Sequence, residues 1–194
     1  MIRAFVAIEL PDNLRKVVLE LIETLQDLPG SRELRWVKPQ ALHLTLVFLG
    51  DVDSNMIPKI SSSTRTCALD QAPFEVNLAR PGAFPGWEKA RVLHLGVEDP
   101  SQKMIDLQRS ITQALEPLGF KPEKRPFTPH LTLARVRNKA NRDELELFTK
   151  PARRTRLTGT FSWSVVDFHL VQSELLPQGP KYTLLECFNL GASR

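Results

Sequence analysis

Two of the four histidines in the chain open the same tetrapeptide: His43 begins one HLTL and His130 begins another. Successive side chains of a β-strand point to opposite faces, so in a strand each histidine shares a face with the threonine two positions on, Thr45 or Thr132. The leucines of each motif, and Phe48 beyond the first, are expected on the other face. Each strand would then present an imidazole and a hydroxyl to one side and bury its leucines on the other.

The four polar side chains suit phosphodiester chemistry if the two strands line a common groove. An imidazole titrates at about pH 6.5, so one of the pair can be neutral and act as a base while the other is protonated and acts as an acid. The hydroxyls of Thr45 and Thr132 can donate hydrogen bonds to non-bridging phosphate oxygens. Arg135 could add a forked, charged contact to the same anion, although an exposed arginine in a salt bridge explains it equally well. In-line attack on phosphorus needs a base, an acid and charge neutralisation, which these residues supply without a metal or a cofactor.

Other chemistries leave no comparable pattern in the sequence. It contains no HExxH, paired CxxC, GxxxxGK[ST] or GxSxG, the patterns of zinc sites, triphosphate loops and acyl-transfer nucleophiles. Cys67 and Cys187 are isolated, which favours a reducing, cytoplasmic compartment and argues against both a disulfide framework and a zinc site; a single bridge between them remains open. His94 and His169 have no threonine in the HLTL position and are interpreted as ordinary strand residues.

The segments around the motifs predict mixed helices and strands. Apolar residues at helical spacing predict amphipathic helices over 14–25 and 104–118, and two further helices are expected near 55–70 and 141–149. Apolar runs bounded by turn residues predict strands at the start of the chain, around each motif, and near 74–80, 90–98, 157–172 and 181–188. His130 follows His43 by 87 positions, about half of the 194 residues. Because a helix precedes the motif strand in each half, we expect two similar α+β lobes.

Composition is that of a globular chain. With 194 residues, 42% of them hydrophobic and 25% charged, the chain can bury a core as one domain or as two small fused lobes. No apolar run approaches the roughly 20 residues that cross a bilayer, which excludes a membrane-spanning role. The short apolar start runs into Glu9 and Pro11 and predicts a first strand instead of a signal peptide.

Positive charge gathers in the second half of the chain. The stretch 121–156 holds eleven Lys or Arg against four acidic residues, a net charge of +7, whereas the whole chain is at +4. Such a stretch attracts polyanions such as RNA, although a solvated surface is the simpler explanation. Trp36, Trp87 and Phe84 could stack on bases and Tyr182 could border the groove, but packing in the core, in loops or in a hairpin explains them as well.

The paired motifs, taken with their contexts, resemble a known family. The sequence is similar to the 2H phosphoesterases, specifically to the RNA 2',3'-cyclic phosphodiesterases of the 2'-5' RNA ligase group. The likeness spans nearly the whole chain, through the segments RAFVAIELP, WVKPQALHLTLVFLGDV, RVLHLGVE, FTPHLTLAR and LVQSELLPQGPKYTLLE.

This resemblance implies a fold, an activity and roles for the motif residues. It implies one bilobal α+β domain over residues 1–194, with two lobes of antiparallel sheet related by a pseudo-twofold axis, flanking helices and a central groove. It implies hydrolysis of terminal 2',3'-cyclic phosphates of RNA to 2'-phosphomonoesters. The chain is expected to act as a monomer and without a metal. His43 would be the proton donor and His130 the proton acceptor, an assignment that the symmetry of the motifs leaves open, while Thr45, Thr132 and Arg135 would bind the phosphate.

Two other functions remain open from the sequence. A 2'-5' RNA ligase could use the same groove if an RNA 5'-hydroxyl replaced water. A non-catalytic RNA-binding module would explain the basic stretch, but it gives no reason for two matched pairs of histidine and threonine.

Overall fold

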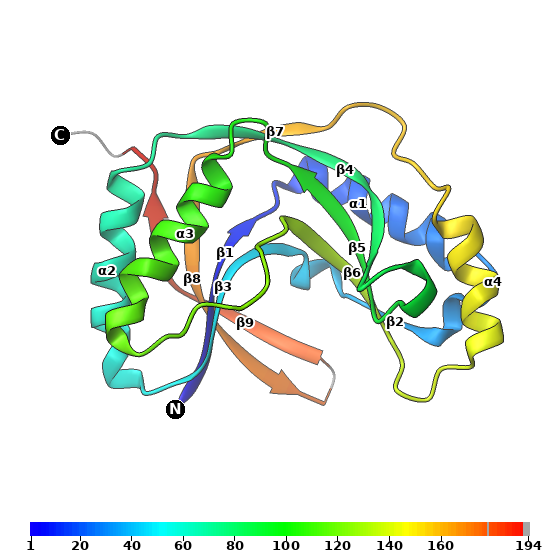
Figure 1. Cartoon of the computed structure of the whole chain (residues 1–194), viewed down its shortest axis with the longest axis horizontal. Coiled ribbons are helices and arrows are strands. Elements are labelled where there is room, and N and C mark those ends of the chain that lie inside the picture. Colours follow the sequence, from blue (N-terminus) through cyan, green and yellow to red (C-terminus); the bar gives the residue numbers. More distant parts are fainter. Residues whose placement is uncertain (178, 192–194) are drawn as a thin grey trace.

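The two motif strands lie side by side at the centre of one antiparallel sheet. The computed structural model describes residues 1–177 and 179–191. Within them the strands follow the order β7-β4-β5-β6-β3-β1-β8-β9, and β2 pairs with β6 outside that path. The strands are β1 (Ile2–Glu9), β2 (Leu34–Trp36), β3 (His43–Val52), β4 (Phe74–Phe84), β5 (Val92–Glu98), β6 (His130–Val136), β7 (Ser162–Val165), β8 (Asp167–Leu176) and β9 (Gly179–Asn189). The sheet is curled, and its two halves meet where β3 runs beside β6 (Figure 1).

Four α-helices accompany the sheet among the described residues, and all four were expected from the sequence. They are α1 (Asp12–Gln26), α2 (Ile57–Leu69), α3 (Lys103–Leu115) and α4 (Arg142–Ala152). The start of α4 shows why a helix begins there: the Asn141 side chain accepts hydrogen bonds from the backbone N–H groups of Asp143 and Glu144, which have no partner inside the helix. None of the described helices combines the length and the apolarity that a bilayer span requires.

The series β1-α1-β3-α2 is repeated as β5-α3-β6-α4, and the repeats exchange helices. α2 packs against α3, while α4 packs against the short 3₁₀ turn Ser31–Glu33 that follows α1. Each end of the molecule therefore holds one helix from each repeat, with α2 and α3 at one end and α1 and α4 at the other (Figure 1). The mixed α+β architecture expected from the sequence is confirmed.

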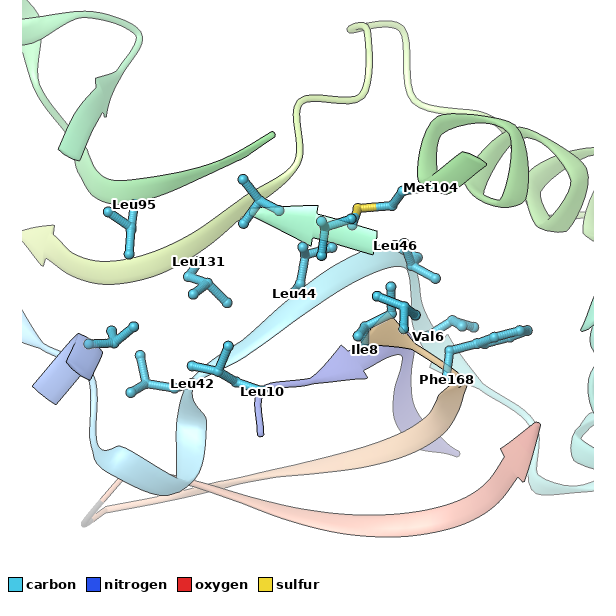
Figure 2. Close-up of a cluster of buried hydrophobic side chains, with 14 of the residues drawn as sticks. Val6, Ile8, Leu10, Leu42, Leu44, Leu46, Leu95, Met104, Leu131 and Phe168 are labelled. Atoms are coloured by element: carbon cyan, nitrogen blue, oxygen red, sulfur yellow. The ribbon is translucent and has the colours of Figure 1, made fainter. Parts of the chain in front are cut away.

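One hydrophobic core joins the leucines of the motif strands to the helices. Leu44, Leu131 and Leu95 are at most 1% exposed. Figure 2 shows these leucines together with Met104 of α3 and Phe168 of β8 in a single cluster. The leucine face of the sheet is thus the helix-covered face, and we call the opposite side the motif face.

Each motif strand contains a β-bulge at the last leucine of HLTL. In β3, Thr45 pairs with Ala7 and Val47 with Val6, so Leu46 has no partner in β1. In β6, Thr132 pairs with His94 and Ala134 with Leu93, so Leu133 has no partner in β5. One extra residue reverses the alternation of faces beyond it.

This reversal corrects one prediction and explains another. Strict alternation placed Phe48 on the buried face, which is wrong: its side chain is 58% exposed and its ring lies 6.3 Å from that of Phe5 on the motif face. In β6, Leu133 and Ala134 are both fully buried, and Arg135 is turned outward onto the side of His130. Without the bulge, Arg135 would point toward the core.

Candidate active site

The structure brings the two histidines and two threonines of the motifs together on one face. The motif strands are antiparallel and Leu44 is paired with Leu131. One step along the strands in either direction therefore puts His43 beside Thr132 and Thr45 beside His130. All four side chains are half-buried and point away from the leucine core, so the sheet itself creates the expected constellation.

Both imidazoles are fixed by a hydrogen bond to the backbone two residues earlier. Nδ1 of His130 lies 2.7 Å from the carbonyl oxygen of Thr128, and His43 makes a corresponding bond to the backbone of Ala41. A carbonyl oxygen only accepts, so Nδ1 of His130 must carry the proton. Nε2 of the neutral ring is then left with a lone pair for acid and base chemistry.

His43 is enclosed by aromatic rings and is neutral in the free protein. It stacks on Phe5, with ring centroids 4.7 Å apart, and meets the edge of Tyr182 at 5.2 Å. Burial lowers the pKa of His43 to about 4; the bond to Ala41 opposes this shift, and the nearby charge of Arg15 adds to it. The ring is therefore uncharged at neutral pH.

Arg15 of α1 fastens the turn that leads into β3. Its guanidinium donates hydrogen bonds to the carbonyl oxygens of Pro39 at 2.8 Å, Leu42 at 3.2 Å and Leu10 at 3.0 Å. The forked geometry of arginine allows one side chain to hold three carbonyls. Because Leu42 directly precedes His43, Arg15 is a positioning residue for this imidazole. Its role was missed by sequence reasoning, since no local pattern links residue 15 to residue 42.

The ring of His130 is also flanked by aromatic side chains, but by a different set from that around His43. Phe84 meets its ring edge-on at 4.9 Å, and His94 approaches it with centroids 5.4 Å apart. Phe84 also stacks on His94 at 4.1 Å. Gly82 of β4 is paired with His94, and its lack of a side chain makes room for the His94 ring: a Cβ at Gly82 would lie 2.6 Å from that ring.

His94 therefore lies against His130, a contact that its interpretation as an ordinary strand residue did not include. Burial, with a smaller contribution from the charge of His130, lowers the pKa of His94 to about 4, so it is a neutral neighbour of His130. The only signal that could have revealed it is the register of β5 against β6, which pairs His94 with Thr132 and which the sequence does not display.

Tyr182 and Arg135 border the same face. Burial raises the pKa of Tyr182, while the positive charges of Arg135 and Arg3 oppose the rise. Tyr182 is consequently a neutral phenol that can donate a hydrogen bond. Both arginines lie close enough for their charges to act on it. The structure thus places Arg135 where an anion held between the motifs would meet its charge. Cys67 and Cys187 are both free, so the bridge left open by the sequence does not form.

Comparison with known proteins connects this constellation to a family. Residues 11–175 match the profile of the 2'-5' RNA ligase superfamily. The RNA 2',3'-cyclic phosphodiesterase of Methanothermobacter thermautotrophicus is 36% identical over 189 residues, which cover 97% of this chain and 99% of that protein. The protein of the same name from Archaeoglobus fulgidus is 33% identical and covers 96% of this chain and 99% of its own length.

Solved structures agree with this comparison. The crystal structure of TT0787 from Thermus thermophilus superposes with a TM-score of 0.81 at 31% identity, covering 99% of this chain and 100% of the other. The structure of E. coli LigT complexed with 3'-AMP superposes with a TM-score of 0.77 at 26% identity and covers 97% of this chain and 98% of LigT.

Proposed function

The chain belongs to the 2'-5' RNA ligase superfamily, and on that basis we propose that it is an RNA 2',3'-cyclic phosphodiesterase. It opens the terminal cyclic phosphate of RNA and leaves a 2'-phosphomonoester, using two histidines and no metal. The observation that carries the proposal is the Leu44–Leu131 pair, which aligns two imidazoles and two hydroxyls on one face of the sheet.

Water is the nucleophile, and His130 is the base. With Nδ1–H bonded to the Thr128 carbonyl, Nε2 of His130 takes a proton from water as its oxygen attacks phosphorus. The bond from phosphorus to the 3'-oxygen breaks, and protonated His43 donates a proton to that oxygen. Thr45, Thr132 and Arg135 hold the non-bridging oxygens, whose negative charge grows in the transition state.

The acid role of His43 requires the substrate to bring about its protonation. In the free protein burial keeps its pKa at about 4. A phosphodiester anion beside the ring favours the charged imidazolium and raises that pKa, because an opposite charge within a few ångströms stabilises the charged form. The proton is thus acquired as the anion binds, so the acid forms only when there is a leaving group to receive its proton.

Ligation is the second candidate, and the name of the superfamily favours it. An RNA 5'-hydroxyl that replaces water would attack the same phosphorus and leave a 2'-5' linkage with no ATP, because the strained cyclic ester supplies the energy. The residues that take and give the protons would be unchanged. We further propose that residues 1–194 act as one bilobal unit, a monomer in the cytoplasm.

The experiment uses a short RNA with a 2',3'-cyclic end, in EDTA, with and without a second RNA that has a 5'-hydroxyl. We expect the 2'-phosphate as the product. His43→Ala and His130→Ala should each lower kcat by about 10²- to 10⁴-fold, since each removes one partner in proton transfer. His169→Ala is the matched histidine control and should retain wild-type turnover. A strict requirement for a divalent metal, a 3'-phosphate as the only product, or wild-type turnover in the His43→Ala/His130→Ala double variant would disprove the mechanism.

The phosphate contacts can be tested with the same substrate. Thr45→Val and Thr132→Val each remove one hydrogen bond to a charged group, so we expect a loss of about 1.5 to 3 kcal/mol of transition-state stabilisation. Arg135→Met should lower kcat/KM by an amount that corresponds to the same loss of transition-state stabilisation. Arg109→Met, which removes an exposed arginine from α3, is the control for a change of net charge.

A further inference from the structure

A second cluster of reactive side chains lies on the motif face, at β8 and β9. Asp167 and His169 are two residues apart on β8 and share a face, and Cys187 of β9 is paired directly with His169. A carboxylate oxygen, a ring nitrogen and the sulfur of these residues all lie within 4.8 Å of one another. The three donors come from neighbouring strands of a continuous sheet, so the backbone holds them in place.

The His169 ring stands between two carboxylates. Its Nε2 lies 3.4 Å from an oxygen of Asp167, and its Nδ1 lies 3.8 Å from an oxygen of Glu9. The side chain of His169 is only 12% exposed, and its Nδ1 is shielded from solvent and has no hydrogen-bond partner among the described residues. A buried ring nitrogen that faces a carboxylate just beyond hydrogen-bond distance is unsatisfied as it stands.

A metal ion between Asp167, His169 and Cys187 would bind Nε2 of His169 and fix Nδ1 as the protonated nitrogen that faces Glu9. Histidines that bind a metal through one nitrogen usually donate the other N–H to a carboxylate. Ligation through Nε2 leaves Nδ1–H directed at Glu9. The movement that is needed is small, since the ligands of a tetrahedral zinc ion lie about 2.0 to 2.3 Å from the metal and the donor atoms are already within 4.8 Å of one another.

The charges of the cluster also favour a cation. The carboxylates of Asp167, Glu9 and Glu186 all lie close enough to the Cys187 sulfur to act on it electrostatically. A bound divalent ion would offset this concentration of negative charge. Cys187 is exposed, so an ion can reach the cluster from solvent.

We propose that Asp167, His169 and Cys187 bind one Zn²⁺ ion, with Glu9 as the outer partner of His169 and water in the fourth position. Sulfur and imidazole ligands select zinc over Mg²⁺ or Ca²⁺, which take oxygen ligands. The sequence alone does not reveal this site, because Cys187 and His169 become neighbours only through the pairing of β8 with β9. The ion takes no part in the cyclic phosphodiesterase reaction proposed above.

The test measures metal binding on the full-length, tag-free, reduced protein after EDTA treatment and desalting. Zn²⁺ alone is titrated against a competing chelating dye, and Co²⁺ is used as a spectroscopic probe. We expect one Zn²⁺ per chain, an affinity that rises with pH as the thiol proton is released, and a Co²⁺ spectrum with a sulfur charge-transfer band and intense tetrahedral absorption.

Matched variants separate this site from ordinary surface binding. His169→Ala and Cys187→Ser should each weaken Zn²⁺ binding at least about tenfold, and Cys187→Ser should abolish the sulfur band of the Co²⁺ form. Cys67→Ala, which removes the other free cysteine, should change neither. Equal Zn²⁺ affinity in wild type and Cys187→Ser, or a Co²⁺ spectrum without a sulfur band, would overturn the proposal and leave His169 as an ion-pairing residue between two carboxylates.

A second measurement keeps the metal site distinct from catalysis. In EDTA, Cys187→Ser should hydrolyse the cyclic phosphate at the wild-type rate. A fall in that rate would show that the cluster belongs to the catalytic site and would contradict the separation proposed here. If wild type lacked cyclic phosphodiesterase activity but bound Zn²⁺ in the expected way, the proposed function alone would fail.

Discussion

Burial gives His43 and His94 the same charge state in the free protein. Each has its pKa lowered to about 4, so both rings are neutral at neutral pH, although they have different neighbours. His43 lies in the field of Arg15, whereas His94 lies against His130. In the proposed mechanism His43 must gain a proton to act as the acid, whereas His94 transfers no proton.

The protonation of His43 should depend on the bound anion. In an NMR titration of the histidine rings, we expect the His43 midpoint near pH 4 in the free protein and at least about one pH unit higher with a nucleoside 2'-phosphate bound, since the phosphate stabilises the imidazolium. His169 serves as the internal control because it lies outside the phosphate contacts. A His43 midpoint that the ligand does not move would remove the basis for its role as acid.

The same two histidines should make the fold less stable in acid. The unfolded chain binds protons at the ordinary histidine pKa of 6.5, whereas the folded chain resists them down to about 4. The unfolded state therefore holds more protons between these values, and the free energy of unfolding should fall as the pH falls through this window. The loss should reach up to about 3 kcal/mol for the enclosed ring of His43 and less for His94, which solvent screens more.

His94→Phe tests this stability prediction while keeping a ring stacked on Phe84. Chemical denaturation at pH 7 and pH 4.5 should show a smaller loss of stability in acid for this variant than for wild type. Val92→Ala, a change on the same strand and face, should lower the stability equally at both values. An unchanged pH dependence in His94→Phe would mean that His94 is not protonated differently in the folded and unfolded states.

At the scale of elements, the segments that precede the motif strands decide where the imidazoles point. Ala41 and Thr128 each supply the backbone group that is hydrogen-bonded to the ring of a motif histidine. The turn before β3 is itself held by Arg15 from α1. A helix of the first repeat is thus connected to the chemistry through one side chain.

Arg15→Met should therefore act on turnover more than on substrate binding. We expect kcat to fall about tenfold or more with a smaller change in KM, because a small misplacement of a catalytic group is costly, and the pKa of His43 should rise because a nearby cation is lost. Arg15→Lys should return the pKa of His43 toward its wild-type value, because the positive charge is kept. It should not restore the full kcat, since a lysine ammonium cannot hold three carbonyl oxygens in the geometry of the guanidinium. Arg65→Met on α2 is the control, and wild-type kcat in Arg15→Met would show that the turn does not need this arginine.

The elements that could be predicted from the sequence are those whose apolar pattern extends over many residues. Helices α1 and α3 and strands β3 and β6 repeat an apolar pattern over many residues and lie where that pattern indicates. β2 was missed, because three residues are too few to show alternation. The bulges were missed because Leu46 and Leu133 look like any other buried leucine in an apolar run, and only their partners reveal that each is an extra residue.

The site could be predicted only as far as the repeated motif reached. The repeated tetrapeptide singled out both histidines and both threonines, because a repeat can be recognised in the sequence without knowledge of the fold. Arg135 was named for its position, but the bulge that turns it onto the motif face is a property of β5 and β6 together. Arg15 and His94 depend on contacts between distant segments and carry no local signal.

At the scale of the whole molecule, the last part of the basic stretch, residues 150–156, forms a positively charged surface at the end of α4. A hollow there is lined by Lys150, Pro151, Arg153, Arg154 and Arg156. Acidic partners offset part of the charge, since Lys150 pairs with Glu146 at 2.8 Å and Arg153 lies 3.8 Å from Glu88. The remaining positive charge can attract the body of an RNA chain whose end occupies the motif face.

Salt should separate capture from chemistry. Added KCl should raise KM for a long RNA much more than for a cyclic mononucleotide, because only the long chain displaces counterions along the basic surface. Arg154→Glu should flatten the salt dependence for long RNA and leave the mononucleotide unaffected. Lys59→Glu, an exposed reversal on α2 at the opposite end of the molecule, is the control. Equal salt slopes for both substrates would mean that the stretch is a solvated surface only.

The exchange of helices between the repeats also bears on how the protein could be divided. A cut in the link 70–73 between α2 and β4 would leave one HLTL in each fragment, so neither fragment alone would contain a complete pair of imidazoles. Yet β1 would still pair with β8, β3 with β6, and α2 would pack against α3 across the cut. The two pieces are built as complementary halves of a split enzyme, and cyclic phosphate opening would report their reunion.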